Sequence, residues 1–367
     1  MKRLLLEWYK SGNSLKRWVS CFLSHFYLMS FYLKDNLIDA NRRTHKMKSQ
    51  RLINNRALCL LDMLFCYLVL GYFPETYASI GFQNLSFKKR LTFVPPYENI
   101  LFATSLNHEC NLDILHNKNK TYEFLKDLYG REQIIIRSDE DFAAFSEFIS
   151  IHKKFFYKPI DGTCGVNSGL ADSAKIEIFP FFKDLIKTGT YVIEELIVQC
   201  DELASFHPSS VNTIRAAVFK SKNGTEILYG CLRCGQGDNV VDNGAAGGIF
   251  IPFNINTGRL NKIGFDEIGK KYLAHPDSNI SFEDFQIPRF DEIKSLCVKI
   301  TEKFPGLKYV GWDIAISKDK LIVVEGNEIP TLIILEGLHK TGFKKELREI
   351  ACNELIPDGF RSKIEDI

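Results

Sequence analysis

Two acids and an amide near the end of the chain have the types and spacing that a divalent-cation site needs. Asp313 lies in one apolar run, and Glu325 and Asn327 end the next. The polar residues 317–320 between the runs predict a turn, so we expect a β-hairpin that brings the three side chains together. Such oxygen ligands hold Mg²⁺ with open positions for water and phosphate. The alternative is a surface hairpin with solvated acids, because this spacing also occurs by chance.

A lysine followed by a glycine-rich segment predicts a phosphate site upstream. Lys158 ends an aromatic, strand-like run, and residues 161–169 contain three glycines. Glycines let backbone N–H groups approach phosphate oxygens, and the lysine adds a positive charge. The spacing is not that of a P-loop, because the lysine precedes the glycines. An ordinary loop is the alternative interpretation.

A third segment, residues 191–197, is β-branched and apolar and carries Glu194 and Glu195. Such a strand can meet an adenine ring through its backbone groups, and Asp201 or Glu202 would then be placed near ribose hydroxyls. Taken alone, the segment predicts only an edge strand.

The order of these segments resembles the ATP-grasp superfamily. Between the Glu194–Glu195 segment and Asp313, residues 207–215, 232–235, 241–243 and 247–250 resemble the sugar-transfer associated ATP-grasp family, found among genes for bacterial surface polysaccharides. The resemblance covers roughly residues 90 to 340.

The resemblance implies a role for each matching residue. ATP phosphates, adenine and ribose would be held by Lys120, Lys158, Gly162, Thr163, Gly165, Glu194, Glu195, Leu196, Ile197 and Asp201. Lys118 competes with Lys120 for the earlier phosphate-binding position. One or two Mg²⁺ ions, held by Asp313, Glu325 and Asn327, would bridge the β and γ phosphates.

Two arginines are the candidate catalytic residues. Arg215 and Arg233 lie on strand-like runs, and a guanidinium group matches carboxylate or phosphate oxygens bidentately. A common superfamily pattern has an arginine two residues before the first metal acid, but position 311 is glycine here. A surface ion pair is the alternative for either arginine. The candidate substrate residues are His207, Ser209, Asn212, Asp242 and Asn243.

The composition is typical of a protein that has more than one domain and whose cysteines are reduced. The chain has 367 residues, 45% of them hydrophobic, which is enough for more than one core. Its ten cysteines form no regular framework, and the single pair Cys231 and Cys234 lacks the further ligands of a zinc site.

The first 56 residues carry twelve basic and three acidic residues, a net charge of +9 within a whole-chain value of +2. Aromatic residues 18–33 and apolar residues 57–73 are too short or too polar to cross a bilayer and lack a signal-peptide cleavage site, so we expect amphipathic or buried helices. This segment either caps the catalytic core or rests peripherally on the anionic inner face of the membrane. Nucleic-acid binding is disfavoured because no basic stripe continues into the expected site.

The expected fold class is α+β: an ATP-grasp fold, in which two α+β lobes clamp ATP, with an N-terminal helical region and helices on one side of mixed sheets. The expected divisions are a helical region (1–90), a small mixed module (91–152), a first lobe with the glycine loop and hinge (153–205), a second lobe with the substrate and Mg²⁺ site (206–340) and a helical tail (341–367).

The expected activity is that of a cytoplasmic ATP- and Mg²⁺-dependent carboxylate–amine ligase that forms an amide through an acyl phosphate. The resemblance implies that one small-molecule partner is sugar-linked, for example a uronic acid, and that the other is an amino acid or amino alcohol, in capsule or lipopolysaccharide biosynthesis. A sugar kinase and a non-catalytic nucleotide-binding scaffold are the alternatives. The sequence gives no oligomeric state.

Overall fold

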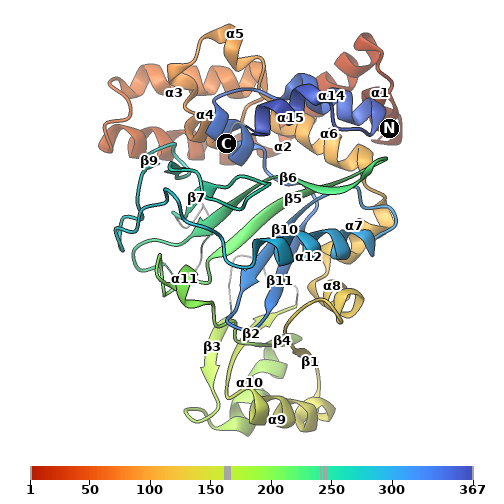
Figure 1. The fold of residues 1–367 in the computed structure, drawn as a ribbon, viewed down its shortest axis with the longest axis vertical. Coiled ribbons are helices and arrows are strands. Elements are labelled where there is room, and N and C mark those ends of the chain that lie inside the picture. The colour runs from red at the N-terminus through yellow and green to blue at the C-terminus, as the bar shows by residue number, and fades with distance from the viewer. Residues whose placement is uncertain (1, 161–166, 240–241, 243–246, 366–367) are drawn as a thin grey trace.

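The computed structural model describes residues 2–160, 167–239, 242 and 247–365. In Figure 1 a helical cap lies above a large sheet, and a small lobe lies below that sheet. The predicted α+β class, with two lobes and a helical N-terminal region, is confirmed. The expected phosphate-binding residues Gly162, Thr163 and Gly165, and the expected substrate residue Asn243, lie outside the described residues.

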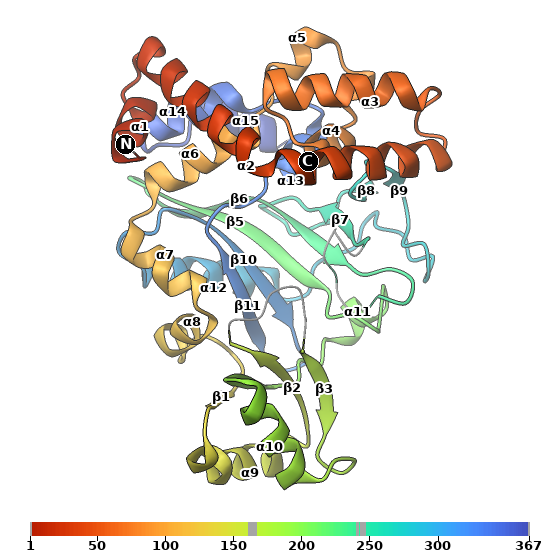
Figure 2. The same cartoon turned by 180° about the vertical axis from the view of Figure 1, so that it is seen from behind.

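The cap joins both ends of the described chain. Helices α14 and α15, from the C-terminal end, lie beside α1 and α6 in both views (Figures 1 and 2). Its N-terminal elements are α1 (Lys2–Lys10), α2 (Ser14–Ser49), α3 (Arg56–Phe65), a π-helical turn η1 (Cys66–Leu70), α4 (Pro74–Ile80), η2 (Phe82–Asn84), α5 (Phe87–Arg90) and α6 (Pro96–Leu106). Its C-terminal elements are α13 (Ile333–His339), α14 (Lys344–Asn353) and α15 (Asp358–Glu365).

Within the described residues, seven antiparallel strands form the large sheet in the order β11-β10-β5-β6-β7-β8-β9. The strands are β5 (Thr213–Ser221), β6 (Gly224–Cys234), β7 (Ile249–Pro252), β8 (Gly264–Phe265), β9 (Lys271–Tyr272), β10 (Tyr309–Ile316) and β11 (Leu321–Asn327). The predicted hairpin of β10 and β11 is confirmed.

Helices cover both faces of the large sheet, so the expectation of helices on one side is wrong for this sheet, and its strand pairs are antiparallel rather than mixed. One face packs on α12 (Phe290–Glu302) through Ile214 and Ile293, and the other packs on α6 and α14 through Phe219 and Leu347. All eight residues of β10 are buried for this reason. Cys231 and Cys234 belong to cores on opposite faces, so they cannot share a metal ion.

The small lobe has its own sheet and core. Its strand order is β1-β4-β2-β3 in the described part of the chain, with β1 (Gln133–Ile136), β2 (Lys154–Pro159), β3 (Gly169–Asp172) and β4 (Tyr191–Glu195). The helices η3 (Asp139–Asp141), α9 (Phe142–Ile151) and α10 (Ile178–Thr188) cover one face. The division expected at residue 152 falls inside this lobe, between α9 and β2, because β1 pairs with β4.

Two connections join the lobes. The chain runs from the cap down to the small lobe through α7 (Glu109–His116) and α8 (Lys118–Leu125), and returns to the large sheet through α11 (Asp201–Ala204). Gly130 approaches β11 so closely that a Cβ there would lie 2.0 Å from the Leu321 carbonyl oxygen, and its φ is +78°. Only glycine fits this position without strain. The hydrogen bond from Val323 N to Tyr129 O, 2.9 Å, fixes the same junction.

Helix α2 fits the amphipathic form of the expectation rather than the buried one, because it has both buried and exposed residues. Trp18, Phe22, Phe26 and Phe31 are each more than half exposed. Among the described residues, no helix combines the length and the hydrophobicity that a membrane-spanning segment requires.

Glu336 on α13 makes the stability of the cap dependent on pH. Its carboxyl group is buried and accepts hydrogen bonds from Val94 N and Phe343 N at 3.0 Å each, and burial raises its pKa to about 8. A raised pKa stabilises the fold fully below the unfolded value, about 4.5, and this stabilisation is lost as pH rises through 8.

We therefore expect the wild type to lose a few kcal/mol of stability between pH 5 and 9, relative to Glu336→Gln, since each pKa unit is worth about 1.4 kcal/mol. The glutamine oxygen can accept both backbone bonds without ionising. Chemical denaturation of the two proteins across this range measures the difference, and parallel stability curves would contradict it.

Candidate active site

The centre of the site is a row of charged residues across three adjacent strands. Arg215 on β5 pairs in register with Asp313 on β10, and Asp313 pairs in register with Glu325 on β11. Directly opposed residues on one face of a sheet lie within contact distance. The sheet register therefore brings together residues that are far apart in the sequence.

Asp313 is the most strongly held acid in the row. Arg215 binds both of its carboxylate oxygens, with Nη2 2.7 Å from Oδ2, and Arg233 Nη1 also donates to Oδ2 at 2.7 Å. Burial alone would raise the pKa of Asp313, but the two guanidinium groups outweigh it and hold that pKa below its usual range. Asp313 is therefore ionised at neutral pH.

Arg233 extends the row to a third acid. Its Nη2 donates to Asp242 Oδ1 at 2.7 Å, and Asp242 Oδ2 accepts from Thr213 N at 3.1 Å and from the Thr213 hydroxyl. Burial raises the pKa of Asp242 in spite of Arg233. Arg233 is thus a bridge between Asp313 and Asp242, whereas Arg215 faces Asp313 and Glu325.

Glu325 and Asn327 complete the predicted metal ligands. Asn327 Nδ2 lies 3.3 Å from Glu325 Oε1, and Arg215 Nη2 lies 3.7 Å from the same oxygen. Burial and the adjacent Asp313 raise the pKa of Glu325. Two carboxylates crowded together with an amide oxygen available beside them fit a hard divalent cation, which would remove this repulsion.

Glycine at position 311 makes room for Arg215. A Cβ at position 311 would lie 3.3 Å from Pro330 Cβ and 3.4 Å from Arg215 Cδ. The side chain of Arg215 therefore lies in contact with the position where a residue-311 side chain would begin. The guanidinium group on the neighbouring strand thus lies close to the place where the superfamily pattern would put its arginine, and the replacement of one by the other stays a prediction.

A cavity of about 400 Å³ opens onto the row. Its walls combine the charged residues with Phe250 on β7 and with Thr331 and Ile334 at the start of α13. The charged side chains therefore reach a space that can admit a small polar molecule.

The small lobe contributes a second charged cluster around Glu194. Lys158 Nζ lies 2.6 Å from Glu194 Oε1, and Arg131 Nη2 lies 3.0 Å from the same oxygen. Glu194 and Arg131 are buried, and Lys158 is half-buried. The predicted strand end and hinge strand are thus neighbours, because β2 pairs with β4.

The hinge residues lead from one lobe to the other. Lys320, in the turn of the β10–β11 hairpin, forms an ion pair with Glu195 at 2.7 Å. Leu196 and Ile197 follow β4 and are half-buried, and Asp201 is exposed at the start of α11. These residues lie at the junction of the lobes, as a hinge must.

Lys120 lies apart from these clusters. It is exposed near the start of α8, and its Nζ contacts Asp113 at 2.7 Å. Its role in phosphate binding stays a prediction.

The residues around His207 form a closed network. His207 Nδ1 lies 2.9 Å from Ser210 Oγ, and Nε2 lies 2.9 Å from Gly237 O. Asn212 Nδ2 donates to the carbonyl oxygens of Leu203 and His207 at 2.8 and 2.9 Å. Ser209 is exposed. The substrate role of His207, Ser209 and Asn212 stays a prediction, and the network holds the loop that leads into β5.

Sequence reasoning missed Arg131, Thr213 and Lys320. Thr213 could have been found, because it lies two residues before Arg215 and shares its face of the strand. Arg131 and Lys320 carried no signal, because their partners Glu194 and Glu195 lie 63 and 125 residues away.

Comparisons with known proteins agree with this arrangement. Residues 181–352 match the model of the sugar-transfer associated ATP-grasp family. No curated protein sequence matches the chain.

Several solved structures are similar to the chain. The ATP-grasp ligase PsnB, complexed with a phosphomimetic variant of its minimal precursor, Mg and ADP, is 13% identical with a TM-score of 0.42, over 70% of this chain and 66% of that chain. The D-alanine–D-alanine ligase of Bacillus anthracis, complexed with ATP, is 13% identical with a TM-score of 0.41, over 71% of each chain. The N5-carboxyaminoimidazole synthetase of Staphylococcus aureus is 13% identical with a TM-score of 0.43, over 70% of this chain and 59% of that chain.

The chain thus spans slightly less than two-thirds of the PsnB ligase. The matched family segment contains β4, the arginine pair and the three predicted metal ligands. The sequence of residues 181–352, slightly less than half of the chain, therefore matches the sugar-transfer associated ATP-grasp family.

Proposed function

We propose that the protein is an ATP-dependent carboxylate–amine ligase. A carboxylate oxygen would attack the γ-phosphorus of ATP, giving an acyl phosphate and ADP. The nitrogen of an amine would then attack the acyl carbon and displace inorganic phosphate, leaving an amide. The observation that carries this proposal is the row of Arg215, Asp313 and Glu325 in register beside a cavity.

The charge balance of the row supports a divalent cation as part of the site. Two guanidinium groups and the carboxylates of Asp242, Asp313 and Glu325 sum to −1 when all are ionised, so the row alone does not attract a triphosphate. Asp313, Glu325 and Asn327 would hold Mg²⁺, which supplies positive charge to the phosphate oxygens. The described residues contain no group of three or more His, Cys, Asp or Glu suited to a metal. The proposed ligands are two acids and one amide, so they would not form such a group.

Arg215 is the candidate for contact with the reacting groups. Its Nη2 faces both Asp313 and Glu325, at the end of the row where the metal ligands lie. A planar guanidinium group there can orient a substrate carboxylate or bind oxygens of the transferring phosphoryl group. Arg233, held between two acids, would keep Asp313 in position.

Lys158 is the candidate phosphate contact of the small lobe. Glu194, itself paired with Arg131, holds the Lys158 side chain at the end of β2, and the glycine-rich segment follows this strand in the sequence. We expect Lys158→Ala to weaken ATP affinity about tenfold, because a charged hydrogen bond is worth about 1.5–3 kcal/mol.

Calorimetric titration of ATP with Mg²⁺ measures this change. Lys154→Ala is the matched control, since Lys154 is exposed on the same strand and is expected to leave affinity unchanged. Equal affinities of wild type and Lys158→Ala would place the phosphates elsewhere.

The family description favours a sugar-linked substrate. We propose that the acid or the amine is part of a sugar, for example a uronic acid joined to an amino acid or amino alcohol, in the cytoplasmic synthesis of capsule or lipopolysaccharide precursors. The second substrate would bind in the cavity beside the row, near Asp242.

A substrate panel tests the proposal. Uronic acids and their nucleotide-linked forms are combined with amino acids and amino alcohols, and phosphate release and product mass are recorded. Phosphate release that requires both an acid and an amine, with a product one water lighter than their sum, supports the ligase. A sugar that gains a phosphate group without an amine would replace the ligase with a kinase.

A further inference from the structure

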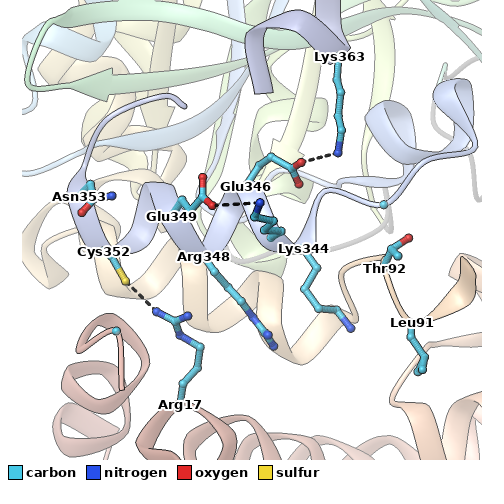
Figure 3. Close-up of a pocket in the computed structure, with 13 residues that line it drawn as sticks. Arg17, Leu91, Thr92, Lys344, Glu346, Arg348, Glu349, Cys352, Asn353 and Lys363 are labelled. Carbon is cyan, nitrogen blue, oxygen red and sulfur yellow. Dashed lines mark hydrogen bonds and ion pairs between the residues drawn. The ribbon is translucent and has the colours of Figure 1, made fainter. Parts of the chain in front are cut away.

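A second cavity, of about 600 Å³, lies in the helical cap and is separated from the active-site row by the large sheet's upper core. In Figure 3, Lys344 and Arg348 extend from α14 toward α2, and Arg17 extends from α2 toward α14. Gly12 and residues 91–92 complete its nearby walls. Side chains from three separate parts of the chain thus converge on one space.

Basic side chains predominate in this cavity, with five lysines and arginines against two glutamates. Three of the bases have carboxylate partners: Lys363 contacts Glu346, Lys345 lies 3.9 Å from Glu349, and Arg348 binds Glu98. Arg17 and Lys344 are therefore the two bases at the cavity without a carboxylate at ion-pair distance in the described residues.

The guanidinium group of Arg17 is held in place by one strong hydrogen bond and one weak one. Its Nε donates to Tyr9 O at 3.0 Å, and its Nη2 lies 2.7 Å from Cys352 Sγ. A thiol sulfur is a weak acceptor, and a phosphate oxygen accepts from guanidinium much more strongly. The bond to Tyr9 fixes the direction of Arg17 while leaving its outer nitrogens able to bind an anion.

Lys344 and Arg348 lie one turn apart on the same face of α14. Like charges at this spacing repel each other. The nearest polar partner of Lys344 is the Tyr72 hydroxyl, at 3.4 Å. Arg348 is already paired with Glu98, so Lys344 is the member of this pair that an added anion would contact.

An apolar groove of about 350 Å³ adjoins the basic cavity. The two spaces share Gly12, Arg17 and Arg348, and the groove is walled by Trp18 and Phe22 of α2 and by Tyr97 of α6. Trp18 and Phe22 stack with ring centroids 5.4 Å apart and are 62% and 52% exposed. The groove thus joins a cationic end to an apolar surface.

The apolar surface continues along α2 beyond the groove. Its exposed members include Phe26, Tyr27 and Phe31, at 60%, 65% and 69%. Contiguous exposure of this kind indicates a binding surface. The +9 charge of the first 56 residues favours an anionic occupant over a neutral one.

We propose that the basic cavity and the adjoining groove bind an amphiphile with a phosphate head, the phosphate lying between Arg17 and Lys344 and the apolar chain lying on Trp18 and Phe22. A free lipid-like molecule and a lipid within a membrane share this chemistry. The site does not depend on the proposed ligase activity, because none of these residues belongs to the active-site row.

The test uses the full chain and dodecyl phosphate below its micelle-forming concentration, with calorimetric titration and Trp18 fluorescence. We expect saturable binding with a blue shift of emission, and little binding of dodecyl maltoside, which has the same chain and no phosphate. Arg17→Gln combined with Lys344→Met should weaken binding at least about tenfold, because two charged contacts are lost. Arg3→Gln, which also removes one charge of the segment but lies outside both spaces, should bind as the wild type.

Further variants and measurements serve as controls. Lys344→Arg should retain binding, and circular dichroism should show that each variant is folded. Trp18→Phe should lose the blue shift while binding persists. ATP hydrolysis should be unchanged in Lys344→Met, which separates this site from the ligase.

The source of the phosphate is distinguished by flotation with vesicles of phosphatidylcholine alone or with phosphatidic acid. Retention by phosphatidic acid vesicles alone identifies a membrane lipid, and binding of dodecyl phosphate without vesicle retention identifies a free amphiphile. The proposal is overturned if dodecyl phosphate binds no more tightly than dodecyl maltoside, if the double variant binds as tightly as the wild type, or if the apolar surface is covered by a second copy of the chain in solution.

Discussion

Glu325→Gln is expected to lower the turnover of ATP about a thousandfold while the protein stays folded. Glutamine keeps the size of the side chain and one oxygen, but it removes the charge that would face a divalent cation beside Asp313. Loss of several kcal/mol of charge stabilisation in the transition state corresponds to about this factor. The half-exposed side chain of Glu325, in contrast to buried Asp313, allows the change without a large loss of stability.

Steady-state phosphate release at saturating ATP measures the effect. Glu226→Gln is the matched control, because Glu226 lies in the same sheet on β6 and pairs with Arg361 at 2.8 Å, away from the row. We expect the control to retain normal turnover. Near-normal turnover in Glu325→Gln would contradict the proposal that Glu325 is a metal ligand.

Arg215→Lys is expected to reduce turnover about a hundredfold or more. Lysine keeps the positive charge, but it cannot bind both oxygens of Asp313 and reach toward Glu325 with the same rigid group. Loss of a positioned donor to developing charge in an active site typically costs about this factor.

Comparison with Arg233→Lys separates catalysis from scaffolding. Arg233 also binds Asp313, but its other nitrogen is held by Asp242 rather than directed toward Glu325. We expect Arg233→Lys to lower the melting temperature similarly and to lower turnover less. An equal loss of turnover in the two variants would show that Arg215 acts only by holding Asp313.

The sequence was sufficient to predict the hairpin of the metal ligands. Two apolar runs separated by four polar residues leave one plausible pairing, and the observed register places Asp313 opposite Glu325. The neighbour of Asp313 on its other side could not be predicted, because Arg215 lies 98 residues away. The pairing of distant strands depends on the whole fold rather than on a local pattern.

The two faces of the large sheet show a second limit of sequence analysis. On the Arg215 face of β5, Ala217 and Phe219 pack under α6 and α14, whereas Thr213 and Arg215 reach the cavity. The helices that cover this face come from both ends of the chain. Packing between remote segments decides which helix covers which surface, and a local sequence pattern does not contain this information. For the same reason the sequence did not predict which face of α2 is exposed.

The claim that ATP activates the substrate carboxylate is tested most directly by following the transfer of oxygen from that carboxylate to phosphate. The acid identified in the substrate panel is labelled with oxygen-18 in its carboxylate and converted to product with unlabelled ATP, Mg²⁺ and the amine. Formation of an acyl phosphate predicts that the released phosphate carries one labelled oxygen from the acid. Released phosphate without label, together with a product that retains both labelled oxygens, would contradict activation of the carboxylate by ATP.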